Sequence, residues 1–120
     1  MVAVMLDEAR TDRILHALSD ATRRDILTRS LVGPHSVSSL ARNYAMSLAA
    51  VQKHVAVLES AGLVTKERHG RESRVTGQID SVRAARRLLD HYEDVWRDRL
   101  DRFGEVLATI PAEPLQEGNA

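Results

Sequence analysis

Residues 47–63, SLAAVQKHVAVLESAGL, carry the side chains whose types and spacing suggest the clearest chemistry, which is contact with DNA bases. Gln52 can hydrogen-bond an adenine edge at two atoms, and Lys53 can contact a base edge or a phosphate. Ala49 and Ala50 are small enough to let the backbone approach the bases, and Ala49 can meet a thymine methyl group. We expect a helix that can lie in a DNA major groove, although an ordinary surface helix would share this pattern.

Hydroxyl groups and a histidine accompany this helix. Ser47 is a good N-cap and a second candidate for a phosphate contact, because a helix N-terminus directs N–H groups toward anions. His54 borders the apolar side of the helix, so both a packed histidine and a base contact fit the sequence. Three serine hydroxyls open the short helix that comes before, where they either cap it or bind phosphates: Ser36, Ser38 and Ser39.

Other chemistries have little support in the 120 residues. The chain has no cysteine, which excludes disulfides, thiolate metal sites and cysteine nucleophiles. The histidines are scattered, no catalytic pair of serine or carboxylate groups stands out, and no glycine-rich loop could hold a phosphate. We therefore expect no enzymatic activity and no cofactor. Because there is no signal peptide and no long apolar run, we expect a cytoplasmic protein without membrane contact.

The charges are unevenly distributed. Lys and Arg together number 17, as do Asp and Glu, so the formal net charge is zero. Five basic residues face three acidic ones between residues 47 and 74, whereas from Asp80 onward nine acids face six arginines. A basic middle could bind phosphates locally. Zero net charge also supports the alternative of a module that binds protein instead of DNA.

Apolar spacing predicts the elements that would position these residues. After a loose start at residues 1–6, we expect four helices, at residues 7–18, 21–31, 37–42 and 47–61. The second should bury Ile26, Leu27 and Leu31, and the fourth should bury an apolar stripe of Leu48, Val51, Val55 and Leu58. A short helix, a turn at residues 43–46 and a helix with a polar outer face predict a helix-turn-helix.

A β-hairpin should follow at residues 63–76, with Gly70 and Arg71 as its turn. A hairpin beside a DNA-reading helix is a wing, and its basic side chains can reach phosphates or the minor groove. These side chains are Lys66, Arg68, Arg71 and Arg74. Arg71, at the tip, is the first candidate for such a contact, and a solvated charge is the alternative.

A long helix should span residues 80–110. Thirty residues of helix reach about 45 Å, which exceeds the width of so small a domain. We therefore expect its apolar stripe, together with the first helix, to face a second copy in a two-fold dimer. The expected dimer contacts are Leu15, Leu18, Leu89, Tyr92, Trp96, Leu100 and Phe103. A bend near Gly104 is the alternative.

These elements predict a mainly α fold with a small β-hairpin, a winged helix-turn-helix dimerising through its first and last helices. Residues 1–110 should form one DNA-binding and dimerisation domain, and residues 111–120, with two prolines, a disordered tail.

Four segments resemble the ArsR family of bacterial winged-helix repressors. They are ALSDATRRDIL (17–27), MSLAAVQKHVAVLESAGLV (46–64), RHGRESRV (68–75) and YEDVWRDRLDRF (92–103). The last is similar to a branch of the family with an aromatic-rich final helix and no metal site. The resemblance, over residues 15–107, implies a homodimer that represses transcription from a palindromic double-stranded DNA operator. An inducer that the sequence does not name is a further expected partner.

The chain departs from the family pattern at two places. Gln52 replaces the usual serine, which should change the operator that is read. The metal-binding cysteines are missing, and the zinc site that other members build on the last helix is incomplete. His91 and Asp94 match half of that site, but Asp80 stands where a histidine is usual. We expect no metal, with a zinc-responsive repressor as the alternative.

Overall fold

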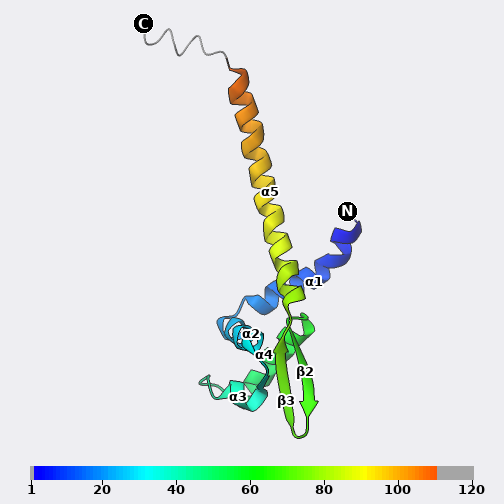
Figure 1. The fold of residues 1–120 in the computed structure, drawn as a ribbon, viewed down its shortest axis with the longest axis vertical. Coiled ribbons are helices and arrows are strands. Elements are labelled where there is room, and N and C mark those ends of the chain that lie inside the picture. The colour runs from blue at the N-terminus through cyan, green and yellow to red at the C-terminus, as the bar shows by residue number, and fades with distance from the viewer. Residues whose placement is uncertain (1, 111–120) are drawn as a thin grey trace. The chain divides into compact units, whose positions relative to one another are not determined.

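The computed structural model describes the backbone of residues 2–110 and the side chains of residues 8–110, so the predicted tail at residues 111–120 lies outside it. Its contacts divide the chain into two compact units, Met1–Arg86 and Arg87–Ala120. The elements in chain order are α1 (Val2–Leu18), α2 (Ala21–Val32), β1 (His35–Ser36), α3 (Val37–Ala41), α4 (Leu48–Ser60), β2 (Val64–His69), β3 (Glu72–Gly77) and α5 (Ile79–Thr109) (Figure 1).

The corner between α1 and α2 is held by side-chain hydrogen bonds. Asp20 caps α2 and accepts a 3.0 Å bond from the backbone N–H of Arg23. Arg23 donates to the carbonyls of Ala17 (2.8 Å) and His16 (3.0 Å), and Arg24 donates to that of Leu18 (2.8 Å). These carbonyls belong to the last turn of α1, where the helix itself supplies no N–H donor for them. The two arginines donate to them instead.

The start of α1 corrects the sequence analysis. The helix begins at Val2, so the loose start predicted at residues 1–6 is wrong from Val2 onward. No glycine or proline stands between Val2 and Leu18 to interrupt the helix. Met1 lies outside the described residues.

The helix-turn-helix packs α3 and α4 against α2 around one core. Val51, Val55 and Leu58 of α4 are fully buried, as predicted, and so are Ile26 of α2 and Leu40 of α3. The three helices thus share one apolar centre, and α4 can turn its other side to solvent.

Two residues predicted in this core are largely exposed. Leu31 is 42% exposed because it lies near the end of α2, where its side chain covers Gly77 and leaves its outer side open. Leu48 is 46% exposed because it is the first residue of α4, ahead of the buried stripe.

The end of α4 redirects the chain into the wing. Gly62 adopts a left-handed φ of 71°. Its N–H bonds to the carbonyl of Glu59 (2.9 Å), while the N–H of Leu63 bonds to that of Leu58 (3.0 Å). This pair of bonds is a Schellman motif, which requires a residue that tolerates positive φ. Leu63 is fully buried, so the same turn that ends the helix anchors the hairpin to the core.

The sheet has three strands in the order β1-β3-β2, all antiparallel. The predicted hairpin is therefore present as β2 and β3, but the prediction of a hairpin alone is incomplete. His35 and Ser36 form β1 and pair with Val75 and Arg74 of β3. A strand of two residues has no apolar period to reveal it, and it exists only because the fold brings it beside β3.

The turn of the helix-turn-helix is fastened to α2. Tyr44 donates a 2.6 Å hydrogen bond from its hydroxyl to a carboxylate oxygen of Asp25, which also accepts a 2.9 Å bond from Arg29. Desolvation of the phenol, and then its bond to Asp25, raises the pKa of Tyr44 to about 12. The same hydrogen bond, and then that of Arg29, lowers the pKa of Asp25.

We expect the substitution Y44F to reduce the slope with which the free energy of unfolding falls as the pH rises above 10. Between the ordinary pKa of 10 and the folded value of about 12, folded protein keeps a Tyr44 proton that the unfolded chain has lost. The free energy of unfolding therefore falls as pH rises through this window, by at most about 1.4 kcal/mol per pH unit. Urea unfolding of wild type and Y44F across the window would measure this slope. Equal slopes in wild type and Y44F would contradict the assignment.

The second unit contains α5 from Arg87 onward. The helix is continuous through Gly104 to Thr109, so the alternative of a break at Gly104 is wrong. Large apolar side chains are about half exposed along its length, among them Leu89, Trp96 and Phe103.

Candidate nucleic-acid interface

The outward side of α4 presents the predicted base readers. Gln52 and Lys53 are exposed, as is Ala49, whereas Ala50 is half-buried. Since the opposite stripe of α4 is buried in the core, these side chains project from a helix whose position is fixed by packing. The small Ala49 leaves room for a base edge beside Gln52.

Two of the predicted serines cap helices. The Ser47 hydroxyl accepts a 3.1 Å bond from the N–H of Ala50, and the Ser36 hydroxyl accepts a 3.1 Å bond from that of Ser39. Each capping oxygen still carries a hydrogen that can be donated to a phosphate. Ser38 is exposed and Ser39 is half-buried, so Ser38 is the more accessible of the two.

His54 is set back from the exposed side of α4 that carries the predicted base readers. Its Nδ1 is 3.3 Å from a terminal nitrogen of Arg23 and 3.9 Å from a carboxylate oxygen of Asp20, and the side chain is 22% exposed. The backbone N–H of Arg23 is the main cause that lowers the pKa of Asp20, and His54 adds to it. The arrangement favours the interpretation of His54 as a packed histidine, one that joins α4 to the α1–α2 corner.

The two faces of the wing differ in charge. Directly opposite residues of an antiparallel pair lie on the same face. Lys66 stands opposite Val75 and Arg68 opposite Ser73, so one face carries two cations without an acid across the ladder. Val75 is fully buried, so this is the face that covers the core at its base.

On the other face each of the two glutamates has an arginine or a histidine directly opposite. Arg74 stands across from Glu67, and His69 stands across from Glu72. His69 also lies 3.6 Å from Glu67. Arg74 therefore differs from the other wing cations in having an acid directly opposite, a difference that only the strand register reveals.

Gly70 and Arg71 form the tip, as predicted. Gly70 has a φ of 64° at the first position of a two-residue turn, as in a type II′ hairpin. Arg68 donates a 3.2 Å bond to the carbonyl of Gly70 and so braces the turn. Arg71 follows it and is exposed.

The predicted dimer contacts are mostly accessible. The exposed fractions are 61% for Leu89, 61% for Tyr92, 53% for Trp96, 49% for Leu100 and 61% for Phe103. Leu15 of α1 is 41% exposed. Leu18 is the exception, because it is partly buried against its own core and offers little surface to a partner.

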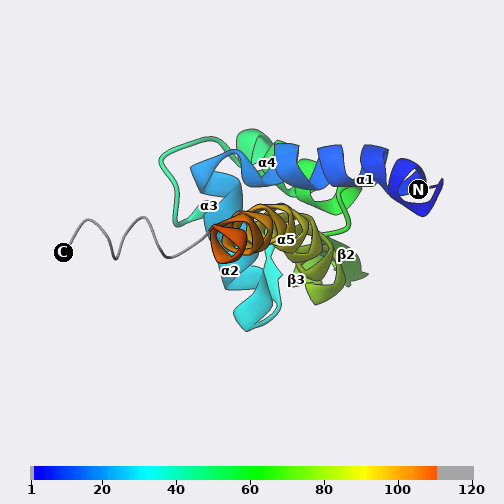
Figure 2. The same ribbon diagram turned by 90° about the horizontal axis from the view of Figure 1, so that it is seen from above.

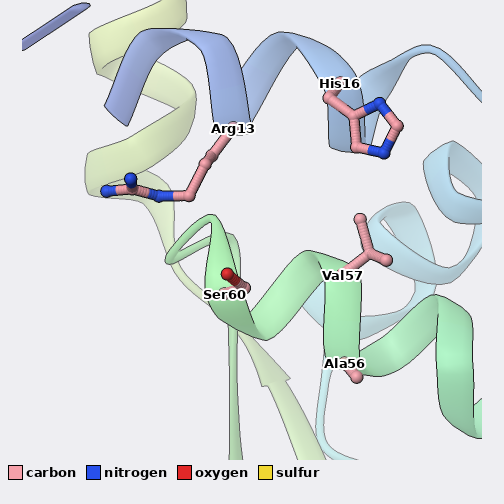
Figure 3. A pocket seen from close by; sticks show the side chains of 5 residues that line it. All are labelled: Arg13, His16, Ala56, Val57 and Ser60. Atoms are coloured by element: carbon pink, nitrogen blue, oxygen red, sulfur yellow. The ribbon is translucent and has the colours of Figure 1, made fainter. Parts of the chain in front are cut away.

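A shallow groove runs between α1 and α4, which lie side by side (Figure 2). Its volume is about 280 Å³, and its lining comprises Arg13, His16, Ala56, Val57 and Ser60 (Figure 3). The predicted base readers of α4 do not line it.

The histidine and carboxylates considered for zinc do not form a cluster. Among residues 8–110, whose side chains are described, no group of three or more His, Cys, Asp or Glu side chains is placed to hold a metal ion. His91 and Asp94 are both exposed, and the ring of His91 lies 5.8 Å from that of Tyr92. In the same described range, no helix combines the length and apolar character needed to cross a membrane.

Leu48 is a candidate functional residue that the sequence analysis placed in the core. It precedes Val51 by three positions and Gln52 by four, and both spacings bring side chains together on a helix surface, so the spacing alone does not decide between the core and the outer side. Its 46% exposure is what places Leu48 outside the buried stripe.

Comparison with known proteins agrees with this geometry. No family model matches the chain. It is 36% identical over 98 residues to the HTH-type transcriptional regulator Rv2034 of Mycobacterium tuberculosis, with 80% of this chain and 87% of the relative covered. An ArsR-like transcriptional regulator from Rhodococcus sp. RHA1 is similar in structure, with a TM-score of 0.76 and 31% identity over 86% of this chain and 94% of that one.

A third relative is the homodimeric winged helix-turn-helix DNA-binding domain Mb0332 from Mycobacterium bovis, a possible ArsR-family regulator. Its TM-score is 0.57 at 25% identity, over 83% of this chain and 88% of that one. The winged helix-turn-helix named for this relative is the same arrangement as the helix-turn-helix and wing described above. The chain belongs to the ArsR family of winged helix-turn-helix, DNA-binding transcriptional regulators.

Proposed function

We propose that this regulator is a homodimeric repressor that binds a palindromic operator through α4 and the β2–β3 wing, without enzymatic activity. The observation that carries the proposal is the division of α4 into a fully buried apolar stripe and an outer side bearing Ala49, Gln52 and Lys53. A helix packed in this way can enter a major groove while its domain stays intact. Binding there would block access of the transcription machinery to an overlapping promoter.

The second unit supplies the support for a dimer. Leu89, Trp96 and Phe103 recur every seven residues, with Tyr92 three residues after Leu89. A seven-residue apolar repeat is the seam by which two helices pair. Exposed aromatic side chains of this size are costly in water, and a second copy of α5 would cover them. The homodimer of the Mycobacterium bovis relative supports the same assembly.

The seam contains one cation. Arg99 interrupts the apolar series, and its guanidinium carbon lies 5.4 Å from the centre of the Trp96 ring. This is cation–π distance, so the charge rests on an aromatic face. Stacked in this way, the arginine can lie at a helix–helix contact with its charge partly compensated.

The proposal is tested by titrating the promoter region of its own gene with the full chain at fixed salt. We expect a saturable shift, a protected palindrome, a protein mass in solution of twice 13.4 kDa and reduced transcription in vitro. A chain that binds no DNA at physiological salt would instead support the protein-binding alternative. Activation of transcription would refute the repressor role, and zinc-dependent release of the operator would favour the zinc alternative.

We expect the two faces of the wing to differ in their contribution to binding. R68A removes a cation from the unbalanced face and should reduce the slope of log affinity against log salt by about one. R74A removes the same side chain from the face where Glu67 stands opposite, and should change the slope less. Fluorescence anisotropy over a salt series measures both slopes. If R74A flattened the slope more than R68A, the assignment of the faces would be wrong.

A further inference from the structure

We propose that Leu48 contacts a thymine methyl group in the operator, beside the base pair contacted by Gln52. The inference rests on the proposed function, because it places α4 in the major groove. It adds a specificity residue that is apolar and reads a different chemical group.

Leu48 is only partly covered by the rest of its domain. It is 46% exposed as the first residue of α4, whereas Val51, Val55 and Leu58 of the same helix are fully buried. Ala49 next to it is exposed as well. The N-terminal turn of the helix therefore presents an apolar surface on the same side as Gln52.

The spacing suits neighbouring base pairs. Four residues of helix advance by about 6 Å and about 40°. Base pairs follow one another at about 3.4 Å, so a helix lying along the groove would set the two side chains one to two base steps apart. Gln52 offers the amide that pairs with adenine, and the thymine C5-methyl is the apolar group that the major groove exposes.

DNA fits this surface better than an apolar protein partner would. The N–H groups of Leu48 and Ala49 belong to the first turn of α4 and have no carbonyl acceptor within the helix. The N–H of Ala50 is already satisfied by Ser47. An apolar protein face over Leu48 would bury the first two groups without partners. A major groove places phosphate oxygens beside base methyl groups, so it can satisfy both the N–H groups and the leucine.

The test removes one methyl group at a time from the DNA. Each thymine of the mapped half-site is replaced by deoxyuridine, which differs only in lacking the C5-methyl, and affinity is measured at fixed salt. For the wild-type protein we expect one position at which the change weakens binding about fourfold, the value for burying one methyl-sized group. L48A should bind the thymine site more weakly and should be insensitive to uracil at that position. L48M should keep the sensitivity.

V32A is the matched control, because Val32 is an 85% exposed aliphatic residue at the end of α2. It should retain the wild-type response to uracil, and thermal melting of each variant checks folding. If wild type and L48A lost the same affinity at every uracil position, the inference would be overturned while the proposed function stood. If wild type bound no operator, the proposed function itself would fail.

Discussion

W96A should weaken dimerisation by about 2–4 kcal/mol, or roughly 30-fold to 1,000-fold in dissociation constant. Trp96 is the largest side chain on the exposed seam of α5, and it is 53% exposed in the single chain. An interfacial tryptophan buries more apolar area than any other residue, and it also supports the stacked Arg99. Its loss should therefore remove packing from both halves of the two-fold contact.

The effect on DNA follows from the dimer. A palindrome is bound tightly when two linked helices occupy both half-sites, because the second contact is then intramolecular. At protein concentrations below its dimer dissociation constant, W96A should bind the full operator little better than it binds a half-site. Sedimentation equilibrium and anisotropy measure the two constants. D98A is the control, since position 98 lies on the opposite side of the same turn and should leave both unchanged. A monomeric W96A that bound the palindrome with wild-type affinity would disprove the coupling.

Q52A should lose about 1–3 kcal/mol of discrimination at one base pair in each half-site. Gln52 is exposed on α4 and contributes to no buried contact, so the substitution should leave folding unchanged. The Gln52 amide can donate one hydrogen bond to an adenine edge and accept another from it. A different base at that position leaves at least one of these two hydrogen bonds unformed.

The measurement compares affinities for operators that differ at single positions. Wild type should prefer one base pair strongly at the Gln52 position, and Q52A should accept all four there more evenly. Q52S is the informative second variant, because serine makes shorter and less selective contacts. An equal loss of affinity on every operator variant would show that Gln52 is not a reader.

Local signals made most of the fold predictable from sequence. Asp20, Ser36 and Ser47 each cap the helix that directly follows them, and Gly62 ends α4 with a left-handed φ. Such caps depend on a few neighbouring residues, so they can be read without knowledge of the tertiary structure. The hairpin turn at Gly70 and the long α5 were predictable for the same reason.

What the sequence did not reveal depends on distant partners. The β1 strand exists through its pairing with β3, and the direction of Leu48 depends on where the core ends. The unequal faces of the wing follow from strand register, because a shift of one residue would exchange them. The role of Arg23 cannot be predicted from sequence, since its contacts with α1 and His54 exist only once the corner between α1 and α2 has formed.

Arg23 has a mechanical consequence. Its guanidinium holds the last carbonyls of α1 and, through the same group, touches His54 of α4. The guanidinium thus links α1, which precedes the helix-turn-helix, to α4, which carries the predicted base readers. A force that pulled α1 aside would therefore either break these bonds or transmit strain to α4.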